Sequence, residues 1–479
     1  MRVFQLAILA AALGAALPVG AQTAPQPQGL QQRVEARLGE AGPGIRFGLV
    51  VATEDGREIV AIAPDQRFIP ASNTKIFTTA AAFATLPNLD QPDPAGGTAV
   101  RLARRAGGAP DVVLEGRGDA RLSSAQNCTA DCLAALADAV AAQARTVHDI
   151  IGDDSFFPDQ RWSPGMSWNN IPTSSGTAIS ALTLDDNELA LRVTPTEAGH
   201  PPGVDMLAYY VIENRAVTVA TGTTDLAIDR LPGSNLLRLT GTIVMGAPEW
   251  LRLGIDDPAH FAAWRLRALL AARGVRVTGA VTARHRPQGS ATPAVAPVGE
   301  PLARLAPPPL AEDLRIINKV SQNLHAELML RRLGRRNGTG AIADGLAVVR
   351  TMLEQAGLRR TDYDFSDGSG MSTYNRVSPR GMVTLLRWAT TQPWGAAWRA
   401  TFPVAGVDGT LARRFRGTAL ESRLFAKTGT LNATNAISGY LTARSGRTLI
   451  FSFYANDVPD GASATPAMDA ALLLIAEQN

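Results

Sequence analysis

Apolar and polar positions recur with recognisable spacing in the N-terminal part of the chain, which predicts its first elements. We expect a helix at 30–38, strands at 45–52 and 58–63, and a helix at 72–86. The last of these has apolar residues at core-facing spacing, at Ile76, Ala80, Phe83 and Ala84. Ser72 would therefore open this helix, and Lys75 would follow about one turn later on the same face.

Two stretches rich in proline and glycine, residues 86–97 and 287–309, divide the rest of the chain. Between them the pattern predicts mostly short strands, such as 112–114 and 207–212, with helices at 131–147 and 260–273. Beyond the second stretch we expect helices at 310–333, 341–358 and 379–391, strands at 421–426, 435–441 and 448–454, and a last helix at 467–477. The two stretches are therefore candidate domain boundaries.

The N-terminus has the pattern of a secretory signal peptide. Arg2 precedes an apolar run over residues 3–17, and small residues lead to Ala21, where we expect cleavage. The alternative is a membrane anchor, but the run is short for a bilayer span and a proline-containing tail follows it. We expect a signal peptide at 1–21, export to the periplasm, and no stable membrane anchor.

Composition narrows the classes of function. A chain of 479 residues with 46% hydrophobic content is expected to form two or three globular domains. The net charge is only +3 and the arginines are scattered without interleaved aromatic residues, which argues against nucleic-acid binding. Cys128 and Cys132 have the spacing of a small disulfide, and a metal site is the weaker alternative because no histidine stands near them. We predict neither a metal nor a cofactor.

The basic residues are almost all arginine. Of 46 lysines and arginines only three are lysine, namely Lys75, Lys319 and Lys427. Arginine stays protonated, whereas burial can make lysine lose its proton, so a retained lysine is a candidate general base.

These lysines mark three short motifs. Lys75 ends a Ser-x-x-Lys that begins at Ser72, and Lys427 opens a Lys-Thr-Gly. Lys319 lies two residues before a Ser-x-Asn formed by Ser321 and Asn323. Each motif alone also fits a structural serine or a surface lysine, but the three in this order are typical of penicillin-binding proteins and serine β-lactamases.

The two motif serines are 249 residues apart, so a large segment is inserted between them. With this insertion, the chain resembles the D-alanyl-D-alanine carboxypeptidase/endopeptidase family of class C penicillin-binding proteins, the S13 peptidases, over nearly its whole mature length. Residues 180–183, 318–319, 367–372 and 403–410 also resemble segments of that family. One departure is Gln322, where many relatives carry aspartate.

The resemblance implies an α/β (α+β) fold with a serine β-lactamase/transpeptidase-like catalytic domain. That domain would comprise residues 22–90 and 300–479, and residues 91–299 would form a large, β-rich inserted domain pair.

The same resemblance and the needs of acyl transfer assign roles to residues. Ser72 is expected to be the nucleophile, Lys75 the general base, and Ser321 the relay of the proton to the leaving group. A base working near pH 7 needs its pKa lowered by about three units, roughly 4 kcal/mol, which we attribute to Lys427 and partial burial. The expected substrate-binding residues are Asn323, Lys427, Thr428, Gly429 and Thr430, with Asp153 and Thr410 as weaker candidates.

Within this group, backbone N–H groups of Ser72 and Thr430 would form the oxyanion hole. Asp153 would meet the ammonium group of a diaminopimelate side chain; the alternative for it is a turn residue. Lys319 is assigned only to the surroundings of the site.

We therefore expect a serine D-Ala-D-Ala carboxypeptidase, and as a further activity a DD-endopeptidase, acting on peptidoglycan stem peptides that end in D-Ala-D-Ala and acylated by β-lactam antibiotics. Two alternatives stay open, a β-lactamase and a non-catalytic peptidoglycan-binding scaffold. Acylation and turnover of penicillin separate the three.

Overall fold

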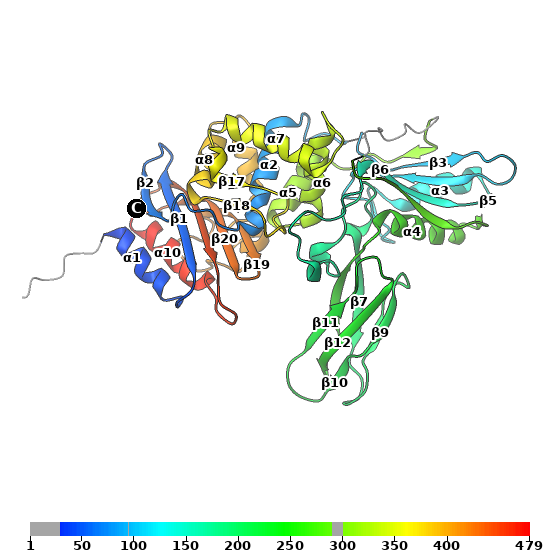
Figure 1. Ribbon diagram of the computed structural model, residues 1–479, viewed down its shortest axis with the longest axis horizontal. Coiled ribbons are helices and arrows are strands. Elements are labelled where there is room, and N and C mark those ends of the chain that lie inside the picture. The colour runs from blue at the N-terminus through cyan, green and yellow to red at the C-terminus, as the bar shows by residue number, and fades with distance from the viewer. Residues whose placement is uncertain (1–28, 94, 290–299) are drawn as a thin grey trace, which may run out of the picture.

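The computed structural model describes residues 29–93, 95–289 and 300–479. The expected signal peptide at 1–21 lies outside the described residues. Figure 1 shows a sheet-and-helix body at one end of the molecule, a second sheet at the other end, and a β-rich lobe that extends away between them. In the described part of the chain, no helix has both the length and the apolar character needed to cross a bilayer.

The body is built on a five-stranded antiparallel sheet that joins the two ends of the chain. In spatial order its strands are β19 (Leu424–Leu431), β20 (Thr434–Thr442), β21 (Thr448–Asn456), β1 (Arg46–Thr53) and β2 (Glu58–Ile62). Alternate residues of β1 serve two cores: Leu49 and Val51 pack on one side, Val50 and Ala52 on the other. A hydrophobic core therefore lies on each face of the sheet.

One face is covered by α1 (Leu30–Gly39) and α10 (Thr465–Glu477), which lie side by side in Figure 1. The opposite face carries the helices α2 (Thr74–Thr85), α5 (Leu310–Lys319), α6 (Asn323–Arg335), α7 (Ile342–Gln355), α8 (Pro379–Thr390) and α9 (Gly395–Ala400). A short strand pair, β17 (Tyr363–Asp364) and β18 (Arg376–Val377), lies between α7 and α8 in sequence.

Two predicted elements in this body are wrong in detail. The single helix expected at 310–333 is two helices, because the chain breaks after Lys319 and passes through Ser321 with a φ of 66°. The apolar spacing continues across the break, so periodicity alone could not reveal it. The strand expected to end at 426 continues to Leu431, which places the Lys-Thr-Gly motif inside β19.

The segment between the first two motifs forms its own sheet and core. The strands of this sheet, in spatial order, are β15 (Val281–Arg286), β6 (Ile150–Pro158), β4 (Asp111–Glu115), β3 (Ala99–Ala103) and β16 (Ala303–Arg304). Packed against them are α3 (Leu133–Gln143) and α4 (Pro258–Ala272), with a short parallel pair of β5 (Thr146–Val147) and β14 (Arg276–Val277). Cys128 and Cys132, which precede α3, are joined by a disulfide.

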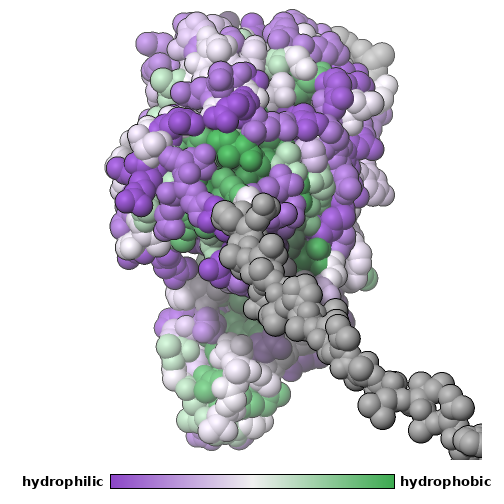
Figure 2. All heavy atoms as spheres, turned by 90° about the vertical axis from the view of Figure 1, so that its left-hand side faces the viewer, coloured by the Kyte–Doolittle hydropathy of each residue, from purple (hydrophilic) through white to green (hydrophobic). Residues whose placement is uncertain are grey.

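The protruding lobe consists of short strands from the middle of this segment. They are β7 (Glu188–Thr194), β8 (Gly203–Asp205), β9 (Val211–Asn214), β10 (Val217–Val219), β11 (Asp225–Asp229), β12 (Leu236–Val244) and β13 (Glu249–Gly254). The strand predicted at 207–212 is largely wrong, since a turn precedes β9 there. Large apolar side chains are exposed on the lobe, namely those of Val211, Leu231, Met245 and Trp250. Figure 2 shows green, hydrophobic patches on the surface of the lobe.

These elements confirm the predicted mixed fold class: helices pack on a sheet in the body, and a β-rich segment is inserted into it.

Candidate active site

Ser72 and Lys75 lie where the body sheet meets α2. A short 3-10 helix, η1 (Ala71–Asn73), carries Ser72 and runs directly into α2. Lys75 is fully buried, and its Nζ lies 2.9 Å from the Ser72 Oγ, 2.6 Å from Asn323 Oδ1 and 2.6 Å from the carbonyl oxygen of Ser369. A neutral amine has two N–H donors and one lone pair. Asn323 and Ser369 can take the donors, which leaves the lone pair for the Ser72 hydroxyl proton.

The Ser369 carbonyl is aimed at Lys75 by a tightly fixed loop, residues 367–375. Asp367 accepts hydrogen bonds from the backbone N–H groups of Gly370 (2.9 Å) and Ser372 (2.6 Å). Glu327 of α6 accepts from the N–H groups of Gly368 (2.9 Å) and Ser369 (2.8 Å). The loop therefore presents a carbonyl rather than an N–H to the lysine.

Burial lowers the pKa of Lys75 to about 7, against the opposing effect of the Asp367 and Glu327 carboxylates. The expected cause was only partly right, because complete burial does this and Lys427 is not among the groups that lower it. Burial, and then the charge of Lys75, lower the pKa of Lys427 well below its usual value. Lys75 is thus able to exist as a free amine near neutral pH.

Ser321 and Lys427 form a second pair. Lys427 on β19 is fully buried, and its Nζ donates to the Ser321 Oγ at 2.9 Å and to the Thr428 carbonyl at 2.8 Å. Ser321 occupies the break between α5 and α6 in the left-handed region, a conformation that costs a residue with a Cβ about 1 kcal/mol or more. Gln322 begins α6 by accepting from the Leu324 N–H at 3.1 Å, so it acts here as a helix cap.

The end strand β19 carries the rest of the third motif. The Thr428 Oγ1 lies 2.7 Å from the Thr410 Oγ1, which brings the weaker candidate Thr410 to this strand. A Cβ at Gly429 would lie 2.7 Å from the Pro70 carbonyl oxygen and 3.0 Å from the Ser72 nitrogen, so the strand passes close to the Ser72 backbone only because this residue is glycine.

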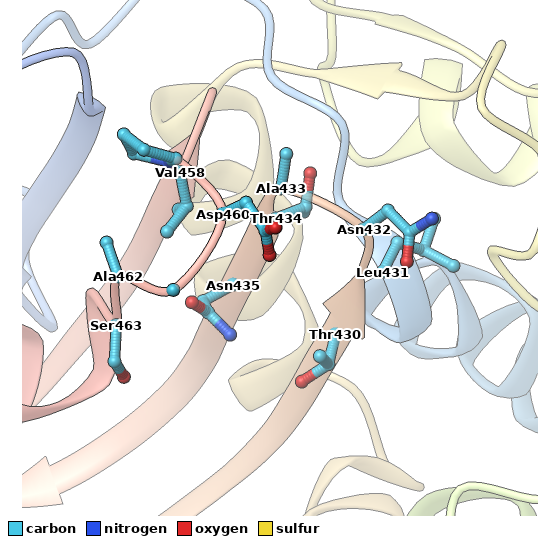
Figure 3. A pocket seen from close by; sticks show the side chains of 12 residues that line it. Thr430, Leu431, Asn432, Ala433, Thr434, Asn435, Val458, Asp460, Ala462 and Ser463 are labelled. Atoms are coloured by element: carbon cyan, nitrogen blue, oxygen red, sulfur yellow. The ribbon is translucent and has the colours of Figure 1, made fainter. Parts of the chain in front are cut away.

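A pocket of about 550 Å³ opens beyond the end of β19 (Figure 3). It is lined by the β19–β20 turn and by the loop that follows β21, and its residues include Asn435, Asp460 and Ser463. Thr430 is the one expected substrate-binding residue that borders it. The pocket is therefore a neighbour of the site and does not coincide with it.

The inserted segment also reaches the site. The Asn323 Nδ2 donates to the Ser175 carbonyl at 3.0 Å. The loop at 367–375 is held from the same side, since Ser372 Oγ donates to the Pro164 carbonyl (2.6 Å) and the Thr373 N–H to the Gly165 carbonyl (3.0 Å). Residues from 164 to 175 thus form one wall of the arrangement around Lys75.

Two other candidates have partners of their own. The Asp153 carboxylate on β6 accepts from Arg284 at 2.8 Å and from the Ser155 N–H at 3.0 Å, so a substrate ammonium group would have to compete with a guanidinium. Lys319 lies 2.5 Å from Asp408, whose other oxygen accepts from the Val404 N–H at 2.8 Å. Lys319 therefore fixes the loop that carries Thr410.

Sequence reasoning missed two groups that contact the central residues, the Ser369 carbonyl at Lys75 and the Ser175 carbonyl at Asn323. It also missed the Glu327 carboxylate, which holds the loop that presents the Ser369 carbonyl. Residues 367–372 had attracted attention as a family-like segment, and this was the available signal for Ser369. Nothing in the sequence marked Ser175, since any residue type supplies a backbone carbonyl.

Comparison with known proteins places this arrangement in context. The model of the D-Ala-D-Ala carboxypeptidase 3 (S13) family matches residues 30–478. A D-alanyl-D-alanine carboxypeptidase of Actinomadura sp. (strain R39) is 35% identical over 450 residues, covering 90% of this chain and 80% of the relative.

The crystal structure of penicillin binding protein 4 (dacB) from Haemophilus influenzae superposes with a TM-score of 0.78 at 21% identity, covering 91% of this chain and 97% of that one. The same H. influenzae protein complexed with a β-lactam gives a TM-score of 0.73 at 20% identity, with 92% and 97% coverage.

Proposed function

The chain belongs to the D-Ala-D-Ala carboxypeptidase 3 (S13) family, and we propose that it is a serine-type D-Ala-D-Ala carboxypeptidase whose acyl-enzyme forms on Ser72. The observation that carries this proposal is the buried Lys75 amine, which has a pKa of about 7 and lies 2.9 Å from the Ser72 hydroxyl oxygen. A buried amine held against a serine has the arrangement needed to activate a nucleophile.

In the proposed reaction the Ser72 Oγ attacks the carbonyl carbon of the penultimate D-alanine, and its proton moves to Lys75 Nζ. The C–N bond to the terminal D-alanine then breaks, and the proton held by Lys75 passes to the leaving amine through the Ser321 hydroxyl, which lies 2.9 Å from Lys427 Nζ. Lys75, neutral again, takes a proton from a water molecule as that water attacks the ester carbonyl. The C–O bond to Ser72 then breaks, the proton returns from Lys75 to Ser72 Oγ, and the shortened peptide leaves with a free carboxyl group. Backbone N–H groups of Ser72 and Thr430 are the proposed oxyanion donors, each worth about 3 kcal/mol.

Substrate binding is proposed to use the end strand. The terminal carboxylate would lie against Lys427, Thr428 and Thr430, where it supplies the negative charge that favours protonated Lys427. Asn323 would hold the substrate amide through its second N–H, and Gly429 would let the substrate approach β19. Thr410, hydrogen-bonded to Thr428, would shape this subsite. Asp153 remains the proposed partner of a substrate ammonium group, in competition with Arg284.

The proposed substrates are peptidoglycan stem peptides that end in D-Ala-D-Ala, met in the periplasm after removal of residues 1–21. Residues 91–299 are the proposed domain pair inserted into the catalytic domain, and β16 (Ala303–Arg304) adds one more strand to the sheet of that insertion. β-Lactams would acylate Ser72 as substrate mimics; the H. influenzae relative has been crystallised with one. Cleavage of cross-linked peptides, the endopeptidase reaction, uses the same bond chemistry and is proposed as a second activity.

Release of D-alanine from a synthetic peptide ending in D-Ala-D-Ala tests this function. We expect release by the wild-type enzyme and none by Ser72→Ala, with the two proteins melting at similar temperatures. Hydrolysis of benzylpenicillin without release of D-alanine would favour a β-lactamase, and the absence of both activities would favour a binding scaffold.

A further inference from the structure

The Asn323 side-chain amide has two possible orientations, related by exchange of its oxygen and nitrogen. Only one of them gives Lys75 a hydrogen-bond acceptor. Its Oδ1 accepts from Lys75 Nζ at 2.6 Å, and its Nδ2 donates to the Ser175 carbonyl at 3.0 Å. If the amide were turned over, an N–H would face the N–H groups of Lys75 and an oxygen would face the Ser175 carbonyl, so both contacts would become repulsive. The Ser175 carbonyl therefore selects the orientation that gives Lys75 its acceptor.

Ser175 in turn lies in a short turn that one indole fixes. It is the middle residue of η3 (Ser174–Gly176), and the Gly176 carbonyl accepts from the Trp162 Nε1 at 2.8 Å. The turn is tightly packed, since a Cβ at Gly176 would lie 2.3 Å from the Asn170 carbonyl oxygen. Trp162 is thus joined to Lys75 through Gly176, Ser175 and Asn323, with a hydrogen bond at each contact between segments.

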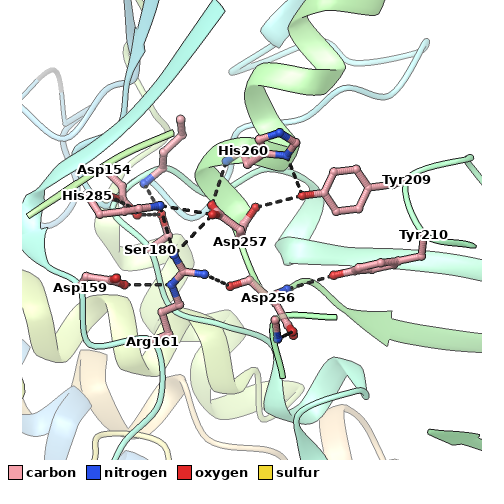
Figure 4. A network of polar contacts seen from close by, with 12 residues as sticks. Asp154, Asp159, Arg161, Ser180, Tyr209, Tyr210, Asp256, Asp257, His260 and His285 are labelled. Carbon is pink, nitrogen blue, oxygen red and sulfur yellow. Dashed lines mark hydrogen bonds and ion pairs between the residues drawn. The ribbon is translucent and has the colours of Figure 1, made fainter. Parts of the chain in front are cut away.

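Arg161, the residue before Trp162, belongs to a polar network of the inserted segment (Figure 4). The neighbouring Arg161 donates to the Asp256 carbonyl at 2.6 Å and to Asp159 at 2.9 Å. His285 lies between Asp154 (2.9 Å) and Asp257 (3.2 Å), and Arg161 lies 3.4 Å from the same Asp257. The Ile179 N–H donates to the Arg161 carbonyl at 3.0 Å, which closes the segment 161–179 into a loop. The backbone that carries Trp162 is therefore held at Arg161 and Ile179.

We infer that Trp162 is a positioning residue for the reaction, although it belongs to the inserted segment: its indole N–H fixes the turn whose Ser175 carbonyl orients Asn323 against Lys75. The inference rests on the proposed function, because it assigns a role within the same site. It implies that the inserted segment is a structural component of the catalytic centre.

The test is Trp162→Phe, which keeps the aromatic packing and removes the N–H, with Trp250→Phe on the distal lobe as matched control. The measurement is the second-order rate of benzylpenicillin acylation from pH 5.5 to 9, together with the melting temperature. We expect Trp162→Phe to slow acylation about fivefold to tenfold, the size of one lost hydrogen bond, and Trp250→Phe to leave it unchanged. In the plot of acylation rate against pH, the rise at low pH should also move to lower pH. The reason is that an Asn323 oxygen no longer held against Lys75 stabilises protonated Lys75 less and so lowers its pKa. A merely structural tryptophan would not move that rise.

Gly176→Ala gives an independent perturbation that keeps the indole and shifts the turn, and we expect the same two effects; it decides the matter if Trp162→Phe does not fold. Acylation within twofold of wild type with an unmoved rise at low pH would overturn the inference. Wild-type protein that forms no adduct at all would instead overturn the proposed function, so the two failures are distinguishable.

Discussion

Replacing Lys75 by arginine should remove the general base while keeping a positive charge at the same place. Arginine cannot lose its proton under these conditions, so its guanidinium offers no lone pair to the Ser72 hydroxyl. The wild-type lysine offers one because its Nζ is buried, lies 2.9 Å from Ser72 Oγ, and is held by two acceptors on its other sides. The variant therefore separates base catalysis from the effect of charge.

The expected size follows from the pKa of about 7 that burial gives Lys75. An amine with the ordinary value of 10.5 would be neutral in roughly one molecule in 3,000 at pH 7, whereas Lys75 is neutral in about half. Burial thus raises the ratio of free amine to ammonium roughly 3,000-fold, which corresponds to about 5 kcal/mol. Loss of a general base typically costs a factor of about 10² to 10⁴, and we expect Lys75→Arg to fall in this range.

Stopped-flow acylation by benzylpenicillin between pH 5.5 and 9 is the assay. Acylation needs the neutral amine, so the wild-type rate should rise with pH, with its midpoint near 7, and Lys75→Arg should show no such rise. The reasoning would be refuted by a wild-type rate that still rises about tenfold between pH 8 and 9, or by an arginine variant that acylates within tenfold of the wild type.

Two further predictions concern the parts that support this centre. Gly370→Ala should lower the free energy of unfolding by at least about 1 kcal/mol and slow acylation. Gly370 has a φ of 89°, and a Cβ there would lie 1.9 Å from the Ala71 carbonyl oxygen. Urea unfolding measures the loss of stability, and an unchanged unfolding midpoint would contradict it. His285→Gln should destabilise the protein most below pH 6.5 and progressively less toward pH 10. Hydrogen bonds to Asp154 and then Asp257 raise the pKa of His285 to about 10. The stability that protonated His285 contributes is therefore lost as the pH rises through that value. Melting temperatures of both proteins at pH 6 and 10 check this, and a difference that grows with pH would count against it.

Much of the arrangement could be predicted where residue type carries the information. The strands β1 and β2 and the helix α2 followed from apolar spacing, and the motifs around Ser72, Ser321 and Lys427 pointed to residues that the fold brings together. The break at Ser321 could not be predicted, because the apolar residues of α5 and α6 keep the same helical spacing from one helix to the next. The Ser369 and Ser175 carbonyls were beyond reach for another reason: backbone groups act by position, and their positions depend on contacts over long sequence separations.

The measurement that tests the central claim most directly is intact mass spectrometry of the protein after brief exposure to benzylpenicillin, followed by peptide mapping. The account predicts one long-lived adduct, located on Ser72 and absent from Ser72→Ala. An adduct that persists in Ser72→Ala, or that maps to another residue, would contradict the assignment of Ser72 as the nucleophile.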